Sequence, residues 1–447
     1  MFRIYESRLQ DWLDKSRKAL LIYGARQVGK TYLVREMLRR NDITYCEFNL
    51  VERNDILDFL MNADDTSDIS TKLALYSDVP LREGESVIFL DEIQKYPDIV
   101  TRIKFLVDEG KYRYILSGSN LGVELKGIRS IPVGYLEAWQ MFPMNYEEFA
   151  MAVGISEAML DHMKECFCKS SPVDDIVHKK LIQTFYYYLI VGGMPAVVNV
   201  FNETHSLDRI DQEQKNIINQ YKADFTRYEL DNRRLKVIAV YDNIPAQLNK
   251  QNRKFNFTLL NRELKFDRYE ESFLWLKDAA VAIPVYIVST PKSPLQISRE
   301  ANVFKLFLND VGLLTSCYPY EIKMQILEMD PDRELNNGAL FENFAAQEFY
   351  AGAGEAFYYR KKSVGEVDFM VESGGHAVPV EVKSGADYKH HAALNHLLES
   401  YGFDNAYVLS ANNVETAGTI TYLPMYMAGL IAAGKDHSDI IIPKIGG

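Results

Sequence analysis

The sequence contains little cysteine and has no excess of positive charge. Only 4 of its 447 residues are cysteine, too few for a disulfide framework in a chain of this length. We therefore expect reduced thiols and a cytoplasmic location. The formal net charge of -12 excludes a wholly basic protein that coats nucleic acid, although a local basic groove is compatible with it.

Long uncharged runs are also scarce. Residues 182–201 form an uncharged window that is long enough to cross a bilayer. This window contains three consecutive tyrosines and is interrupted by Gly192-Gly193-Met194-Pro195. Such a composition is typical of a helix, a turn and a second helix of a globular protein, so we expect no membrane segment. Residues 1–18 read as a charged amphipathic helix and lack the features of a signal peptide.

The length exceeds what one compact core supports, which is about 250–300 residues. Hydrophobic residues make up 47% and charged residues 25%, an ordinary globular composition. Pattern changes divide the chain into three expected domains. These are an α/β domain over residues 1–150, a helical, winged-helix-like module over residues 151–335, and a mixed α/β domain over residues 336–447.

Short apolar runs alternate with helical patterns in the first domain. Strands separated by helices imply a parallel sheet with helices on both faces. The polar stretch 62–68 reads as a surface loop. The expected strands cover residues 19–23, 45–50, 87–90 and 112–116, and the expected helices cover residues 31–40 and 99–109.

The segment between the first strand and the first of these helices fits G-x-x-x-x-G-K-[ST]. Glycines let backbone N–H groups converge on a polyphosphate, and the helix N-terminus adds positive partial charge. We expect Lys30 to reach the terminal phosphates of ATP and the hydroxyl of Thr31 to bind Mg²⁺. The alternative is a chance glycine-rich turn. The predicted nucleotide-binding residues are Gly24, Ala25, Arg26, Gln27, Val28, Gly29, Lys30, Thr31 and Tyr32.

Two carboxylates follow the apolar run 87–90. In open α/β sheets, ligands bind at the carboxyl edge of the strands, where Asp91 and Glu92 are expected. We predict that Asp91 holds Mg²⁺ and that Glu92 orients and deprotonates the attacking water. A solvated pair of carboxylates is the alternative. At the end of the next strand, Asn120 or Ser119 is a candidate to contact the γ-phosphate or the water, unless this segment is an ordinary Ser/Gly turn.

These motifs together resemble the AAA+ ATPases. More closely they are similar to a prokaryotic subfamily with GARQVGKT, FLDEIQ and LSGSN, three strings that all occur here. The resemblance implies Mg²⁺-dependent ATP binding and hydrolysis. It also implies that Arg129 acts as an arginine finger on a neighbouring subunit's nucleotide, which requires a homo-oligomer. The chain has Gly127-Ile128-Arg129 where the subfamily has Gly-Arg, and a surface arginine is the alternative.

A second group of charged residues lies near the C-terminus. Residues two apart in a strand share a face, so Glu381 and Lys383 are expected to project together, with Asp368 on an adjacent strand. Two carboxylates can hold Mg²⁺ and a lysine can position water. This arrangement resembles the PD-(D/E)XK nuclease-like core, and the preceding helix offers Glu342 as a further ligand. An exposed cross-strand ion pair and a folded but inactive nuclease-like domain are the alternatives.

The same resemblance extends to the region that follows this type of ATPase. Its pattern YGG-x-P appears as Val191-Gly192-Gly193-Met194-Pro195, and its D-x-GLL as Asp310-Val311-Gly312-Leu313-Leu314. We therefore expect an ATPase that acts on or near nucleic acid. The open alternatives are a nucleotide-gated nuclease and a nucleotide-dependent switch that binds a protein partner, so DNA, RNA and a protein are all candidate partners.

Overall fold

The computed structural model divides the chain into two compact units. The first comprises Met1–Pro143 with Phe273–Val281, and the second comprises Met144–Ser272 with Ala282–Gly447. The three-domain division stays a prediction. Two predicted site residues, Asn120 and Arg129, lie outside the described residues. The structure describes residues 1–63, 65–119, 132, 134–225, 231–250, 253–256, 269–328 and 337–433.

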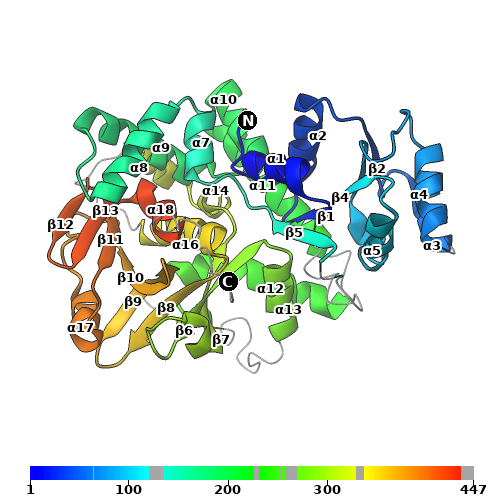
Figure 1. Cartoon of the computed structure of the whole chain (residues 1–447). Helices are drawn as coiled ribbons and strands as arrows, with labels where there is room; N and C mark the ends of the chain where they lie inside the picture. Colours follow the sequence, from blue (N-terminus) through cyan, green and yellow to red (C-terminus); the bar gives the residue numbers. More distant parts are fainter. Residues whose placement is uncertain are drawn as a thin grey trace, which may run out of the picture. The chain divides into compact units, whose positions relative to one another are not determined.

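The first unit contains a five-stranded parallel sheet with the order β2-β3-β4-β1-β5 (Figure 1). This confirms the predicted parallel-sheet α/β fold of the N-terminal region. The inner strands β1, β3 and β4 are buried almost throughout, as expected when helices cover both faces of a sheet. The strands are β1 (Ala19–Tyr23), β2 (Tyr45–Asn49), β3 (Val87–Asp91), β4 (Arg113–Gly118) and β5 (Leu136–Gln140).

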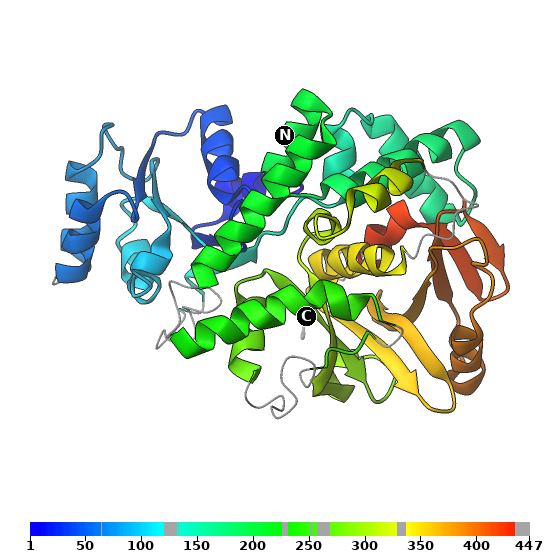
Figure 2. The same cartoon turned by 180° about the vertical axis from the view of Figure 1, so that it is seen from behind.

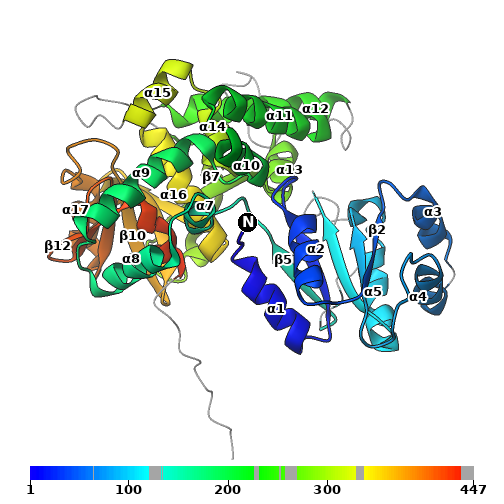
Figure 3. The ribbon, with the colours of Figure 1, turned by 90° about the horizontal axis from the view of Figure 1, so that it is seen from above.

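Apolar side chains of α3, α4 and α5 pack against strands β1 to β4 and form a hydrophobic core in this unit. Two other helices, α1 and α2, lie side by side (Figure 3). One prediction here is wrong: residues 62–68 are not a loop throughout, because the side chain of Asp65 accepts a hydrogen bond from the Asp68 N–H at 2.8 Å and so caps a helix. The helices are α1 (Tyr5–Lys15), α2 (Lys30–Arg40), α3 (Asn54–Asn62), α4 (Thr66–Leu75) and α5 (Ile99–Glu109).

Helices dominate the first half of the second unit (Figure 2). The capping box at the start of α7 pairs Asn145 and Glu148 through reciprocal side chain to backbone hydrogen bonds. Helix α13 (Glu270–Asp278) crosses the boundary between the two compact units. The helices are α7 (Tyr146–Ala152), α8 (Glu157–Lys169), α9 (Asp175–Val191), α10 (Pro195–Thr204), α11 (Leu207–Phe225) and α12 (Asp231–Leu248).

The second half of this unit is built on an eight-stranded mixed sheet, with the order β12-β13-β11-β10-β9-β8-β6-β7. The antiparallel pair β6–β7, which the sequence assigned to a winged-helix-like module, is joined to this sheet because β6 pairs with β8 in parallel. The strands are β6 (Ala282–Val288), β7 (Arg299–Leu308), β8 (Ala356–Lys361), β9 (Gly365–Ser373), β10 (His376–Val382), β11 (Ala406–Ser410), β12 (Glu415–Ala417) and β13 (Ile420–Pro424).

Helix α16 runs along the mixed sheet and contacts strands β6 to β10 (Figure 1). It is buried over most of its length, which explains why its sequence is apolar on several sides. This position brings the inward-facing carboxylate of Glu342 next to the strands. The remaining helices of the second unit are α14 (Val311–Thr315), α15 (Tyr320–Glu328), α16 (Gly338–Ala353), α17 (Ala392–Tyr401) and α18 (Ala428–Ala433).

The glycine pair after α9 meets the segment that begins α14. Asp310 accepts hydrogen bonds from the N–H of Gly193 at 2.6 Å and of Leu313 at 3.0 Å. Burial raises the pKa of Asp310 to about 6. The two motifs that the resemblance joined therefore form one buried structural contact.

In the described part of the chain, no individual helix is both long and apolar enough to span a membrane. Helices α9 and α10 meet the length and composition test only as a pair, and the pair is bent by 116°.

Candidate functional site

The predicted phosphate loop lies between β1 and α2. Gly24 has a φ of +148°, and a Cβ atom there would lie 2.2 Å from the Met141 carbonyl oxygen, so only glycine fits. Gly29 precedes α2 with a left-handed φ of 96°. The loop therefore turns sharply and leaves the first N–H groups of α2 available to an anion.

The ammonium of Lys30 lies inside this loop. It donates hydrogen bonds to the carbonyl oxygens of Gly24 at 3.1 Å and Ala25 at 2.8 Å, and the residue is only 7% exposed. Burial lowers the pKa of Lys30 to about 8, an effect that the nearby negative charges of Glu92 and Asp91 partly oppose. Within the part of the chain that the structure describes, the hydrogen bonds of this ammonium thus go to carbonyl groups of the loop itself.

Asp91 lies at the end of β3, opposite the beginning of α2. The hydroxyl of Thr31 donates to Asp91 Oδ2 at 3.0 Å, and the hydroxyl of Ser117, from the end of β4, donates to Oδ1. Burial raises the pKa of Asp91, and its bonds to the two hydroxyls oppose that rise. A hydroxyl and a carboxylate are hard oxygen ligands, so the donor set of Thr31 and Asp91 fits Mg²⁺.

Glu92 follows directly and has a left-handed φ of 58°, which is uncommon for a residue with a side chain. This backbone directs its carboxylate toward polar groups from two elements. Gln94, in the short helix η1 (Ile93–Lys95), donates to Glu92 Oε2, and Ser119 donates to the same oxygen at 3.3 Å. Gln94 also donates to Ser119 at 3.2 Å. Glu92 is therefore held in a hydrogen-bonded group beside Asp91.

The other residues of the predicted loop differ in exposure. Ala25 and Val28 are buried, and Arg26 and Gln27 are half-buried. Arg26 Nε donates to the Ser119 hydroxyl at 3.5 Å, which brings the loop and the end of β4 together. Tyr32 is 53% exposed on the outer side of α2. The structure thus brings Lys30, Thr31, Asp91 and Glu92 together, as the sequence predicted.

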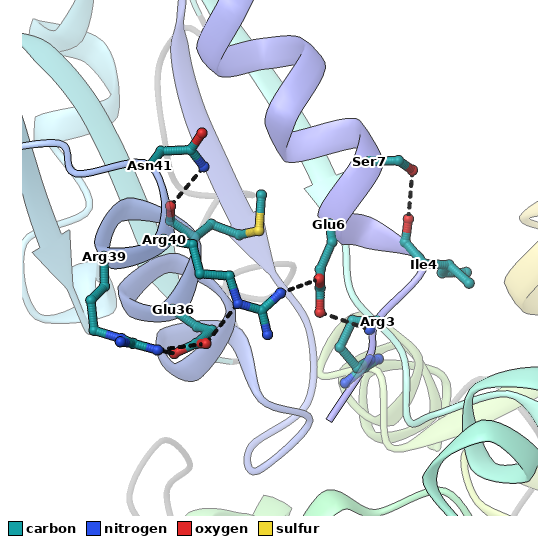
Figure 4. A network of polar contacts seen from close by, with 9 residues as sticks. Arg3, Ile4, Glu6, Ser7, Glu36, Arg39, Arg40 and Asn41 are labelled. Atoms are coloured by element: carbon teal, nitrogen blue, oxygen red, sulfur yellow. Dashed lines mark hydrogen bonds and ion pairs between the residues drawn. The ribbon is translucent and has the colours of Figure 1, made fainter. Parts of the chain in front are cut away.

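Sequence reasoning missed Arg3, a buried residue that hydrogen-bonds to the backbone of this loop. Arg3 is 3% exposed and donates through Nη1 to the Val28 carbonyl and through Nη2 to the Phe142 carbonyl at 2.7 Å. Its backbone N–H donates to Glu6, and Glu6 pairs with Arg40 at the end of α2 (Figure 4). No sequence motif marks Arg3, because its partners lie 25 and 139 positions away.

The predicted residues of the C-terminal cluster are close together on α16, β9 and β10. Glu381 pairs with Lys383 at 2.9 Å, and Asp368 Oδ2 accepts the N–H of Val382 at 3.0 Å. Burial, together with the charge of Asp368, raises the pKa of Glu381 to about 7. Glu342 is 2% exposed on α16.

Lys305 and Arg253 also belong to this cluster, and no sequence pattern linked them to it. Lys305 of β7 is fully buried and its ammonium lies 3.6 Å from Glu342, 2.8 Å from Glu366 and 3.7 Å from Asp368. Arg253 forms an ion pair with Glu342. The predicted Mg²⁺ ligands Glu342 and Asp368 are therefore paired with side-chain cations of the protein, and the arrangement does not fit the metal.

Comparison with protein families divides the chain into three matched segments. Residues 16–150 match an AAA domain. The phosphate loop, Asp91 and Glu92 fall inside this match, which supports an AAA-type P-loop ATPase domain in the first unit. Residues 182–322 match a domain of unknown function (DUF8612), and residues 337–427 match another (DUF4143). Lys305 and Arg253 come from the former segment, and the carboxylates around them from the latter.

Two solved structures share a low level of similarity with the chain. The Walker-type ATPase PABY2304 of Pyrococcus abyssi is 16% identical, with 70% of this chain and 95% of that chain covered and a TM-score of 0.43. The Thermotoga maritima RuvB Holliday junction branch migration motor is 11% identical, with 62% and 87% covered and a TM-score of 0.30. These scores are too low to bear on function. A search of the curated proteins finds no match.

Proposed function

We propose that the first unit binds ATP with Mg²⁺ and hydrolyses it. The observation that carries this proposal is the hydrogen-bonded group at the carboxyl ends of two neighbouring strands. Thr31, the second residue of α2, and Ser117, from the end of β4, both donate to the single carboxylate of Asp91. The buried lysine of a glycine-rich loop lies at the start of the same helix. Phosphate, metal and water sites of a P-loop ATPase require this combination.

Each residue has a separate role in the proposed reaction. Lys30 exchanges the carbonyls of Gly24 and Ala25 for phosphate oxygens, which relieves part of the cost of burying its charge. Thr31 and Asp91 would hold Mg²⁺, which when bound neutralises charge on the phosphates. Glu92 accepts a proton from the attacking water.

Gln94 and Ser119 orient Glu92 in this proposal. Both hydrogen-bond to the same carboxylate oxygen, so the other oxygen is left to contact water. Because these groups come from η1 and from the end of β4, a change in either element moves the base relative to Asp91. Gln94 and Ser119 are therefore positioning residues.

The test compares Glu92→Gln with Lys30→Ala. Glu92→Gln should bind a fluorescent ATP analogue as tightly as the unaltered chain and release phosphate at least about 100-fold more slowly, because only the base is lost. Lys30→Ala should lose both binding and turnover. Phosphate release that Glu92→Gln leaves unchanged would contradict the role of Glu92, and analogue binding that Lys30→Ala leaves unchanged would contradict the nucleotide site.

One feature of the first unit favours a nucleic acid as the partner that stimulates turnover. A groove of about 590 Å³ beside α1 is lined by Arg8, Lys15, Arg17 and Lys18, together with two acidic residues. This is a local basic surface on a protein with a net charge of -12. Phosphate backbones bind such surfaces through counterion release, so the interaction should weaken steeply with salt.

This second proposal is tested with the double variant Arg17→Glu/Lys18→Glu. Single-stranded DNA or RNA should raise the ATPase rate of the unaltered chain, and the double variant should lose that stimulation while keeping its basal rate. Stimulation by a protein fraction but by no nucleic acid would favour the nucleotide-dependent switch instead. The homo-oligomer and the role of Arg129 stay proposals from the resemblance, and sedimentation with and without ATP tests them.

A further inference from the structure

The C-terminal carboxylate cluster contains a buried lysine at its centre. Lys305 is fully shielded from solvent, and three carboxylates lie within 3.7 Å of its ammonium. They come from α16 (Glu342) and β9 (Glu366 and Asp368). The ring of Tyr358 lies 5.1 Å from the same ammonium, so the remaining side of the cation faces an aromatic group.

A second cation is held in place by a short segment that pairs with β7. Lys254 and Lys305 form an antiparallel bridge, and the Phe255 N–H donates to the Phe304 carbonyl at 2.8 Å. This pairing places Arg253 at Glu342, where the two side chains form an ion pair. The region that precedes α16 in sequence therefore supplies Lys305 and Arg253, α16 and β9 supply the three carboxylates, and Arg360 of β8 lies 3.7 Å from Glu366.

The resemblance to a PD-(D/E)XK core requires Mg²⁺ among these carboxylates, and the side chains do not fit that requirement. Oxygen ligands surround Mg²⁺ at about 2.0–2.1 Å, so a metal would compete with the Lys305 ammonium for the carboxylates of Glu342 and Asp368. With Lys305 in place, no group of three or more His, Cys, Asp or Glu side chains among the residues that the structure describes is arranged to hold a metal ion. Glu381, the remaining carboxylate of the pattern, is paired with Lys383.

We propose that the ammonium of Lys305 is the resident cation of this cluster, and that it excludes a divalent metal ion from Glu342, Asp368 and Glu381. The ammonium neutralises part of the buried negative charge that a metal would otherwise neutralise. The cluster is then an internal ionic contact that joins β7 to α16 and β9. A divalent site forms only when Lys305 is removed. This inference is independent of ATP binding in the first unit.

The main test measures Mn²⁺ binding to the full chain without nucleotide, by electron paramagnetic resonance. The unaltered chain and Asp368→Asn should bind the same amount of Mn²⁺, because the native cluster takes none. Lys305→Met should gain one Mn²⁺ site, and Lys305→Met/Asp368→Asn should lose it again. Lys361→Met, a change at an exposed lysine of β8 in the same sheet, should gain no site and serves as the matched control.

Two results would overturn the proposal. One is a Mn²⁺ site in the unaltered chain that Asp368→Asn abolishes, and the other is a folded Lys305→Met that gains no site. If Lys305→Met does not fold, amine acylation of the unaltered chain followed by mass spectrometry decides. Lys305 should stay unmodified with and without millimolar Mg²⁺, whereas exposed Lys361 should react in both. Acylation of Lys305 that appears only with Mg²⁺ would mean that a metal displaces it.

Discussion

The two charged clusters of this chain use the same residue types in opposite ways. In the first unit, Lys30 donates to backbone carbonyls, and Asp91 accepts from two hydroxyls. In the second, Lys305 is surrounded by carboxylates at 2.8 to 3.7 Å. The first arrangement keeps the cation and the anions apart, and the second lets them neutralise each other.

This difference separates a binding site from a structural contact. Where a lysine and carboxylates are kept apart by neutral partners, a polyphosphate and its metal can satisfy both, and binding relieves the cost of their burial. Where they are already paired, a ligand must first break ion pairs in a region of low dielectric, which costs several kcal/mol. A list of carboxylates and lysines in the sequence does not distinguish these cases, because the distances between them decide.

The largest effect that we expect is on stability, from Lys305→Met. Removing one partner of a buried ionic cluster costs about 3–5 kcal/mol, because the charges left behind are uncompensated. The loss should shrink as the pH falls, since the carboxylates can then become neutral. Urea unfolding at neutral and at acidic pH measures the loss of unfolding free energy and its pH dependence. A loss of under about 1 kcal/mol at neutral pH would contradict the central position of Lys305.

The matching change in the first unit is Asp91→Asn, which should reduce turnover rather than stability. An amide keeps the size of the group and loses the charge that would hold Mg²⁺, so the ATPase rate should fall roughly 100-fold or more. Burial raises the pKa of Asp91, so removal of its charge should not destabilise the fold. Phosphate release measures the ATPase rate of Asp91→Asn, and thermal unfolding measures its stability. An Asp91→Asn variant that unfolds at a lower temperature but hydrolyses ATP at the normal rate would contradict this role and would give Asp91 a structural one.

Arg3→Ala should have an intermediate effect on both properties. Two hydrogen bonds from the buried guanidinium to the Val28 and Phe142 carbonyls are lost, which should cost about 2 kcal/mol of stability. Because Val28 is part of the phosphate loop, the KM for ATP should also rise while kcat changes less. Arg82→Ala, at an exposed arginine, is the control. If Arg3→Ala is destabilised but keeps the KM for ATP of the unaltered chain, Arg3 stabilises the fold without affecting the phosphate loop.

The smallest expected effect is a pH dependence of ATP binding. Burial lowers the pKa of Lys30 to about 8 in the free chain, so the side chain loses its proton as the pH rises above that value. Phosphate binding favours the charged form, so binding should take up a proton and weaken as the pH rises above about 8. Calorimetry in two buffers with different ionisation enthalpies counts that proton. Lys30→Arg should bind ATP without taking up a proton. If the unaltered chain and Lys30→Arg take up equal numbers of protons, the group that titrates is not Lys30.

Most of the candidate nucleotide site could be predicted from the sequence because its residues occupy short motifs between regular elements. The strand before Gly24, the helix from Lys30 and the strand ending at Asp91 are local patterns, and the parallel sheet brings their ends together. Strand β5 was missed because it is an edge strand in which Trp139 is the only buried residue.

The second cluster could not be predicted because its decisive residue lies on a strand that the sequence did not reveal. β7 begins with exposed, polar residues, and only its second half is mostly apolar and buried, so no clear strand pattern marks it. Lys305 interrupts the apolar run in that half. Its partners are on α16 and β9, and no local pattern records which strand pairs with which.

The most direct test is calorimetric titration of the full chain with ATP and Mg²⁺, set beside the same titration of Lys30→Ala. We expect one nucleotide bound per chain in the unaltered protein, tighter with Mg²⁺ than without it, and no measurable binding in Lys30→Ala. Equal binding by the two proteins, or none by the unaltered chain with Mg²⁺ present, would contradict the assignment of the phosphate loop and of Asp91.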